Sequence, residues 1–178
     1  MREIQLRTDK LVLSSILVAL SAIFSYVEAI IPIPLGIPGI KLGLANVVIV
    51  FALYNLGFGS AVLISVLRIA IVSALFGNPT MALYSLAGTA VSMLAMMILK
   101  SLKVFSIIGV SMAGGVFHNV GQVMAAVAVM ETTGLFSYLS ALIPVGMLTG
   151  ILIGVITGKA TVHLKRLPGM RTNVRSDA

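Results

Sequence analysis

The stretch that decides the fold of this chain runs from Glu28 to Asn46 and reads EAIIPIPLGIPGIKLGLAN. Pro32, Pro34 and Pro38 fix the backbone φ angle and remove backbone N–H donors, so this segment cannot continue a helix. Each residue before a proline is pushed to extended geometry. Long apolar runs flank the stretch on both sides. We therefore expect a stiff, non-helical connector between two hydrophobic helices, forming a lip at a membrane surface.

The composition of the chain excludes an ordinary soluble domain. Of its 178 residues, 59% are hydrophobic and only 10% are charged, and the mean hydropathy is +1.14. Soluble domains carry about 25% charged residues, and a soluble fold of this length could not bury so much apolar surface. The sequence therefore predicts an all-α membrane protein that crosses the bilayer several times. The chain contains no cysteine, which excludes disulfides, thiolate metal sites and cysteine nucleophiles.

The apolar runs predict six transmembrane helices, because about 20 apolar residues cross a bilayer as a helix. The spans fall at roughly residues 11–31, 42–56, 59–77, 81–99, 105–130 and 135–158. They make up a single six-helix transmembrane domain at residues 1–160. The second span is short, so part of the proline connector would sit within the membrane depth. That arrangement is tolerable only where the connector is buried in protein or lines a cavity.

The distribution of basic residues predicts the topology. An even number of spans places both termini on one side of the membrane. With both in the cytoplasm, ten of the twelve Lys and Arg residues lie inside, Lys41 alone lies outside, and Arg68 lies within a span. This agrees with the positive-inside rule and makes residues 161–178 a basic cytoplasmic tail. The net charge of +7 thus reflects topology, and we expect no nucleic-acid partner.

Arg68 is a charged residue near the middle of the third predicted span. A central charge costs roughly 2.5–3.5 kcal/mol on insertion scales, so it usually faces a cavity or a partner. One interpretation is an anion contact or a gate. The other is a structural pair with Glu28, at the end of the first span, or with helix-end carbonyls. Both interpretations remain open on the sequence.

His118, Asn119 and Gln122 form a polar cluster midway along the fifth predicted span. Positions 118 and 122 share a helix face, and position 119 is adjacent to it. Three hydrogen-bonding side chains together favour the lining of a polar cavity. The alternative is hydrogen bonding between helices, which contributes about 0.6 kcal/mol per bond.

Two further sets of residues are candidates for contacts with other molecules. Lys41 and Asn46 flank Gly43 at the start of the second span, where an ammonium group beside helix N–H groups favours an anion; the alternative for Lys41 is an interfacial lysine that extends to the membrane surface. On the first span, Ser15 and Ala19 form a small-xxx-small pair, with Ala22 close to the same face. Such a face allows close helix contact, either inside the protein or with another membrane subunit.

Several chemistries are absent from the sequence. Aspartate occurs only at Asp9 and Asp177, so no acidic pair is available to hold Mg²⁺ for phosphoryl or prenyl transfer. No Walker A motif is present, and no nucleophile–base pair with an orienting acid is evident. We expect no metal, no cofactor and no enzymatic activity in this chain, so any catalysis would come from a partner subunit.

The residues around the connector resemble a known family. The segment from Glu28 to Pro32, the run Pro38–Asn46 (PGIKLGLAN), the run 84–88 (YSLAG) and the run 117–122 (FHNVGQ), together with Arg68, resemble the Gx transporter family, also named heptaprenyl diphosphate synthase component I. The resemblance covers about residues 10–160. That family is similar to the substrate-binding S components of energy-coupling factor (ECF) vitamin transporters, which are six-helix proteins of the prokaryotic plasma membrane with cytoplasmic termini.

The resemblance implies two functions. In the first, the chain is an S component that captures a small molecule, anionic or isoprenoid-related, from outside and docks through its first helix to a transmembrane coupling subunit driven by two ATPases. Its substrate-binding residues would be Lys41, Asn46, Arg68, His118, Asn119 and Gln122, with Glu28 as a gating or structural ion-pair residue and Ser15, Ala19 and Ala22 as the docking face. In the second, the chain is a non-catalytic membrane partner of a soluble prenyl diphosphate synthase subunit. A third hypothesis is a stand-alone channel or exchanger.

Overall fold

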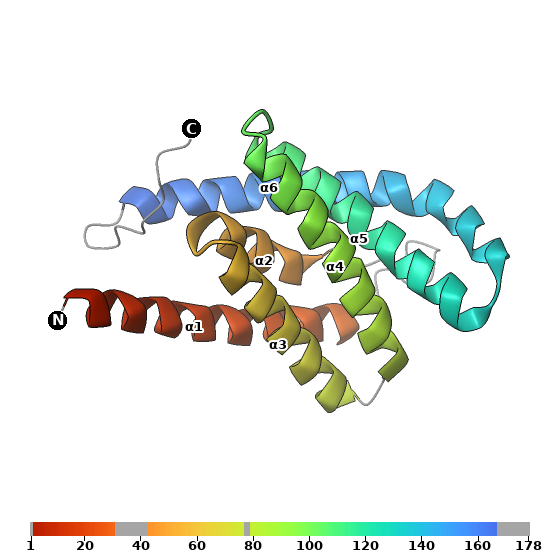
Figure 1. The fold of residues 1–178 in the computed structure, drawn as a ribbon, viewed down its shortest axis with the longest axis horizontal. Helices are drawn as coiled ribbons and strands as arrows, with labels where there is room; N and C mark the ends of the chain where they lie inside the picture. Colours follow the sequence, from red (N-terminus) through yellow and green to blue (C-terminus); the bar gives the residue numbers. More distant parts are fainter. Residues whose placement is uncertain (1, 31–42, 77–78, 167–178) are drawn as a thin grey trace.

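The structure is a computed structural model that describes residues 2–30, 43–76 and 79–166 (Figure 1). Within these ranges nearly every residue is helical and no strand occurs, so the prediction of an all-α protein is confirmed there. The elements are α1 (Arg2–Ile30), α2 (Leu44–Asn55), α3 (Phe58–Phe76), α4 (Pro79–Ser101), α5 (Ile107–Met130), the 3-10 helix η1 (Thr133–Tyr138) and α6 (Leu139–Arg166).

Among the described residues, five helices are long and apolar enough to cross a membrane. These are α1, α3, α4, α5 and, together with η1, α6. The segment expected as a span at 42–56 forms α2, a helix of 12 residues. At 1.5 Å per residue it is about 18 Å long, which is shorter than the roughly 30 Å hydrocarbon core of a bilayer.

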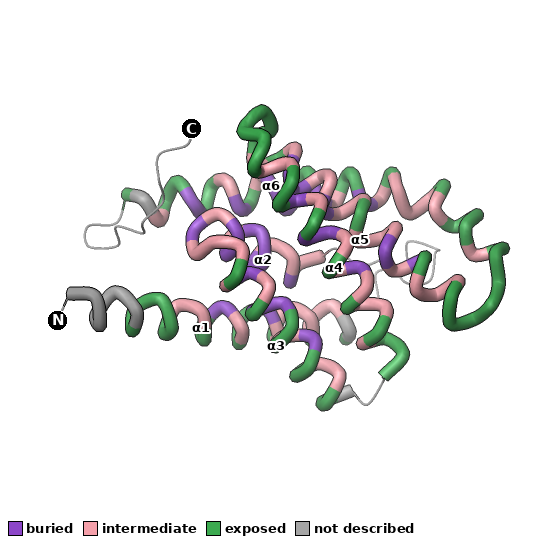
Figure 2. Tube along the Cα trace, in the orientation of Figure 1, coloured by how far each residue is buried: buried purple, intermediate pink, exposed green. Residues whose placement is uncertain are grey.

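The outer surface of the long helices is apolar. Leu11, Leu75 and Leu148 are 67, 72 and 69% exposed, and many other large hydrophobic side chains on α1 and α3–α6 are also exposed. In Figure 2, exposed positions, drawn in green, recur along α1 and α3–α6. A soluble monomer rarely exposes so much contiguous apolar surface. These side chains therefore support a multi-pass membrane protein whose helices face lipid.

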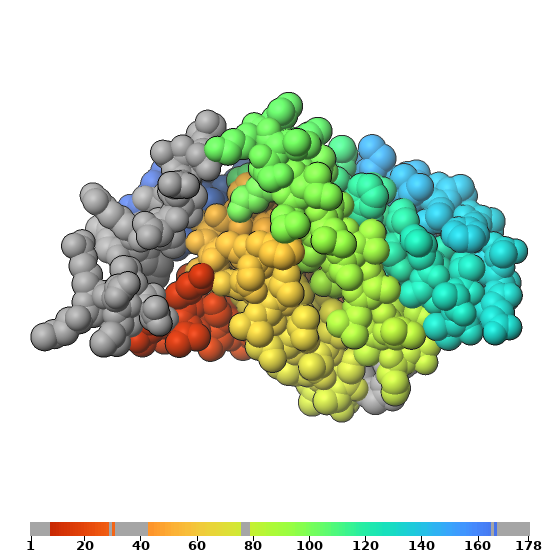
Figure 3. Space-filling view, viewed as in Figure 1, coloured from red at the N-terminus to blue at the C-terminus, as the bar shows by residue number. Residues whose placement is uncertain are grey.

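The core of the protein gathers around α2. Seven of the 12 residues of α2 are buried, and the helix packs against α1, α3 and α6. Ala52 and Leu53 of α2 lie in one hydrophobic cluster with Leu17 of α1, Ile64 of α3 and Val110 of α5. Buried positions concentrate on α2 in Figure 2, and Figure 3 shows α3 and α4 beside it on the same face. The short helix is thus an internal element surrounded by the long ones.

A row of glycines brings α6 very close to α5. Gly146, Gly150 and Gly154 recur at every fourth position and so share one helix face. A Cβ atom added at Gly150 would lie 2.6 Å from the Cα atom of Met112, and one at Gly154 would lie 2.7 Å from that of Ile108. Only glycine permits this separation of the two backbones. The α5–α6 pair is therefore a tightly fixed unit.

The helix ends differ from the sequence prediction in two places. The first span was expected from residue 11, but α1 already begins at Arg2. The last span was expected to end at 158, but α6 continues to Arg166. Hydropathy locates only the apolar part of a helix, and in both places polar residues add helical turns beyond it.

Candidate ligand-binding cavity

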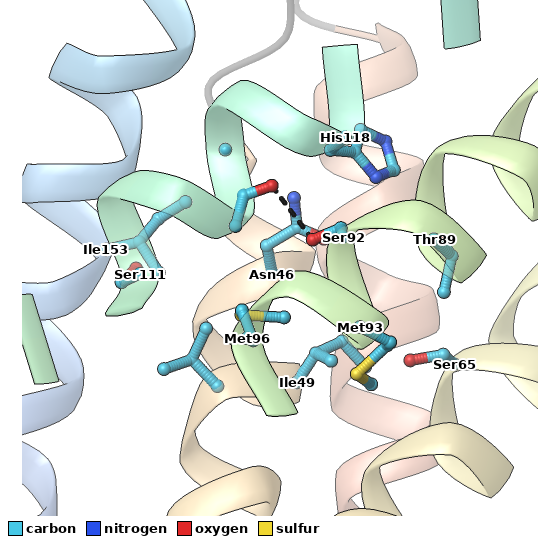
Figure 4. A pocket seen from close by; sticks show the side chains of 13 residues that line it. Asn46, Ile49, Ser65, Thr89, Ser92, Met93, Met96, Ser111, His118 and Ile153 are labelled. Atoms are coloured by element: carbon cyan, nitrogen blue, oxygen red, sulfur yellow. Dashed lines mark hydrogen bonds between the residues drawn. The ribbon is translucent and has the colours of Figure 1, made fainter. Parts of the chain in front are cut away.

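A small polar cavity lies inside the bundle, between α2, α3, α4, α5 and α6 (Figure 4). Its volume is about 20 Å³, which is room for roughly one water molecule. Five different helices contribute side chains to it. Its polar lining residues are Asn46 of α2, Ser65 of α3, Thr89 and Ser92 of α4, and Ser111 and His118 of α5. In the view of Figure 4, Asn46 and His118 lie toward one end and Met93 and Met96 toward the other.

The hydroxyl groups of the cavity differ in how they are satisfied. Ser92 donates to the Gly114 carbonyl oxygen of α5 at 2.8 Å, and Ser65 donates to Ala61 within its own helix at 2.8 Å. Ser111 is 2% exposed, and its hydroxyl has no hydrogen-bond partner among the described residues. A buried polar group without a partner costs about 1–3 kcal/mol. Ser111 is therefore a group that a small polar guest in the cavity would satisfy.

His118 and Gln122 act as a pair, as their spacing on the helix predicts. Their Nε2 atoms lie 3.1 Å apart. The pair faces α4 at Gly88, where an added Cβ atom would lie 2.7 Å from Gln122 Cγ and 2.8 Å from the His118 carbonyl oxygen. Gly88 thus lets α4 approach the pair closely. The structure brings together three of the expected site residues: Asn46 and His118 line the cavity, and Gln122 contacts His118.

Asn119 lies on a different side of α5. Its Nδ2 donates to the Leu142 carbonyl oxygen of α6 at 2.7 Å. An added Cβ atom at Gly146 would lie 2.8 Å from the same Nδ2 atom, so the glycine leaves the space for this amide. Asn119 does not line the cavity, and its described contact links α5 to α6. This geometry fits the alternative of a hydrogen bond between helices.

Arg68 lies between α3 and α1 and is not among the residues that line the cavity. Its Nη1 is 3.4 Å from Ser25 Oγ of α1. Its Nε is buried and has no hydrogen-bond partner among the described residues, and the guanidinium interacts electrostatically with Glu28. Glu28 in turn accepts a hydrogen bond from the backbone N–H of Leu44 at 2.9 Å. These contacts place Arg68 and Glu28 in a polar junction that joins α1, α2 and α3.

The remaining expected residues lie elsewhere. Lys41 lies outside the residues that the structure describes. On α1, Ser15 and Ala19 are exposed and Ala22 is half-buried. The Ser15 hydroxyl donates to the Leu11 carbonyl oxygen of its own helix at 3.0 Å. The face with Ser15 and Ala19 is therefore open to another molecule.

Sequence reasoning missed the four lining residues that carry hydroxyl groups. These are the hydroxyl residues Ser65, Thr89, Ser92 and Ser111. Serine and threonine are common in apolar helices because the hydroxyl can bond to a carbonyl one turn back, so their presence alone carries little signal. To find the hydroxyls on other helices that face His118, one must know how the helices pack, and the sequence alone does not give that packing. Across the described ranges, no group of three or more His, Asp or Glu residues could hold a metal ion.

Comparison with known proteins adds one relationship. The sequence model of a family described as heptaprenyl diphosphate synthase component I matches residues 17–160. No curated protein and no solved structure matches the chain. The matched range runs from α1 through most of α6 and includes every residue that lines the polar cavity. The chain therefore belongs to the heptaprenyl diphosphate synthase component I family.

Proposed function

We propose that this protein is a non-catalytic membrane subunit that binds a small molecule in the polar cavity, as the substrate-capturing S component of an ECF-type uptake transporter. The proposal places the protein in the plasma membrane, counts the short α2 as a sixth crossing beside the five long helices, and on that count places both termini in the cytoplasm. The observation that supports this proposal best is the convergence of Asn46, Ser111 and His118, from α2 and α5, on one buried space. Ser111 contributes a hydroxyl that has no hydrogen-bond partner within the part of the chain that the structure describes. Buried polar groups inside a membrane bundle typically mark substrate paths.

The cavity is too small to hold a drug-sized ligand. A drug-sized ligand needs a pocket of roughly 300–1,000 Å³, whereas this cavity measures about 20 Å³. In this proposal the described structure is a closed form of the site. In this proposal α4 and α5 separate from α2 at the Asn46–His118 end of the cavity when a ligand binds, while α2 stays in place. In this proposal Lys41 lies at the outer lip, and Arg68 and Asn119 hold the helices beside the site.

A second candidate function is a membrane subunit that works beside a catalytic prenyl diphosphate synthase. The name of the family supports it. So does the cluster of cationic side chains at the end of α6, where Lys159 and Arg166 lie beside the start of α5. The chain would then hold the synthase or its product at the membrane and perform no chemistry itself.

Affinity purification from the native membrane distinguishes the two functions. As an S component, the wild type should carry with it a multi-pass coupling subunit and two ATPases. The double variant S15L/A19L should co-purify with much less of the coupling subunit and the ATPases, because leucine side chains prevent close contact at a face of small residues. A matched control is A70L/A74L, which fills another exposed pair with the same spacing on α3. Recovery of a soluble prenyl synthase in place of the ATPases would overturn the transporter assignment and support the second function.

A further inference from the structure

The polar groups of the cavity determine which class of ligand it can bind. They are one amide, one imidazole and four hydroxyl groups, on Asn46, His118, Ser65, Thr89, Ser92 and Ser111. A ligand that enters as the helices separate meets these same side chains. Whether a hydroxyl donates or accepts depends on its existing partners, because it has one proton and two lone pairs. The contacts within the protein therefore indicate what the ligand must offer.

Two of the hydroxyl groups already use their protons on carbonyl oxygens. Ser65 donates to Ala61 at 2.8 Å, and Ser92 donates to Gly114 at 2.8 Å. Both serines are buried. A hydroxyl whose proton is bonded in this way can only accept a further hydrogen bond. Ser65 and Ser92 therefore present oxygen lone pairs to the cavity, which attract an N–H or O–H group and repel the oxygen of an anion.

The contact with Gln122 shows that the imidazole of His118 carries no charge. The two Nε2 atoms lie 3.1 Å apart. The nitrogen of an amide can only donate, so the histidine Nε2 must accept. Both nitrogens of an imidazolium are donors, so the ring in this arrangement is neutral. His118 thus brings a hydrogen-bonding group to the cavity and no positive charge for an anion.

The charged pair of the neighbouring helices is engaged outside the cavity. Arg68 and Glu28 attract each other, and Glu28 also accepts a hydrogen bond from the backbone N–H of Leu44. Neither Arg68 nor Glu28 lines the cavity. A buried charge is costly unless an opposite charge and hydrogen bonds compensate it. A charged ligand would therefore pay this cost among the neutral groups that line the cavity.

We propose that the cavity selects an uncharged molecule that presents hydrogen-bond donors, such as hydroxyl or amide N–H groups, to Ser65 and Ser92. The Ser111 hydroxyl, which has no partner among the described residues, donates to an acceptor atom of the same molecule. Met93 and Met96, which also line the cavity, contact its apolar part. Carboxylates and phosphates are disfavoured because their oxygens would face the lone pairs of the two serines. This ligand class rests on the proposed function, since it describes the same cavity.

The test uses the compound that the full chain carries when it is purified from its own membranes. After the protein is unfolded, the released compound is weighed by mass spectrometry and passed over anion- and cation-exchange columns at neutral pH. We expect a compound that is present in the wild type, absent from N46A/H118A and retained by neither column.

A second measurement tests the acceptor role of Ser65. The rate at which the folded protein loses the compound after dilution should rise about two- to tenfold in Ser65→Ala, which removes one hydrogen bond to the ligand. The matched control is Ser60→Ala on the same helix. The Ser60 hydroxyl donates to the Leu56 carbonyl oxygen, also one turn back, at 3.4 Å and does not line the cavity. This control should leave the rate unchanged.

The possible results separate the ligand class from the proposed function. A wild type without any compound that N46A/H118A lacks would overturn the proposed function and the ligand class together. A compound that is lost in N46A/H118A but retained by either column leaves the cavity as the binding site and overturns only the class. So does unchanged or slower loss in Ser65→Ala, because removing a lone pair should favour an anion. Thermal unfolding checks that each variant is folded, and the column retention and the Ser65→Ala rate decide the class even where N46A/H118A is not.

Discussion

The carboxylate of Glu28, near the end of α1, accepts a hydrogen bond from the backbone N–H of Leu44, the first residue of α2, at 2.9 Å. At the other end of α2, a side chain of opposite charge forms a hydrogen bond with the helix backbone. Lys100 of α4 donates to the Leu53 carbonyl oxygen at 2.6 Å. An anion at the start and a cation at the end both favour a helix dipole. The short internal helix is thus fixed at both ends by charges from the surrounding helices.

Replacing Glu28 tests the cap at the start of α2. Glu28→Ala should lower the stability by about 1–2 kcal/mol, because it removes a capping acceptor and a favourable charge. Glu28→Gln keeps an oxygen acceptor and should cost about half as much. Thermal unfolding of the purified protein in detergent measures both. Equal stability of all three proteins would show that the Leu44 contact contributes nothing.

The contribution of Arg68 to the stability of the protein should depend on Glu28. The two groups attract each other across α1 and α3, so removing either leaves the other charge poorly compensated in a buried site. A double-mutant cycle with Glu28→Gln and Arg68→Met should give a coupling energy of roughly 0.5–3 kcal/mol. Additive effects of the two substitutions would mean that Arg68 is held by other groups.

Lys100 should stabilise the end of α2 through two contacts. Its ammonium donates to Leu53 and also lies 4.7 Å from the centre of the Tyr54 ring. Lys100→Met keeps the length of the side chain and removes both contacts, so we expect a loss of about 1–3 kcal/mol. Lys10→Met, at an exposed position of α1, is the matched control and should have no effect. A loss of similar size in the control would point to a general effect of charge on the detergent-bound protein.

The glycine row of α6 offers a prediction with an internal control. Gly150→Ala places a Cβ atom 2.6 Å from the backbone of Met112, and such overpacking costs typically about 1–3 kcal/mol. Gly158→Ala meets nothing within 4 Å and should be neutral or stabilising, since alanine favours a helix by about 1 kcal/mol over glycine. The midpoint of thermal unfolding should therefore fall in Gly150→Ala and should stay unchanged or rise in Gly158→Ala. Indistinguishable midpoints would contradict the close α5–α6 contact.

The sequence predicted much of this fold because a hydrophobic run of sufficient length has few alternatives in a membrane. It also predicted that His118 and Gln122 share a face, since that depends only on the helix repeat. It could not predict that Asn119 bonds to Leu142 or that Arg68 contacts Ser25, because each contact depends on which neighbouring helix packs against that side of the helix. For the same reason the hydroxyls of Ser92 and Ser111 went unnoticed. Helix propensity and hydropathy describe each helix separately. The cavity forms between several helices, so these two properties do not predict it.

Native mass spectrometry of the protein released from its own membranes tests whether the polar cavity binds a ligand. We expect one bound small molecule per chain in the wild type, and its loss in N46A/H118A, which removes the amide and the imidazole that line the cavity. The control Thr149→Ala removes a hydroxyl that bonds within α6 at 3.0 Å and does not line the cavity; it should keep the ligand. A wild type without any bound molecule, or a ligand retained equally in N46A/H118A, would contradict the assignment of this cavity as the binding site.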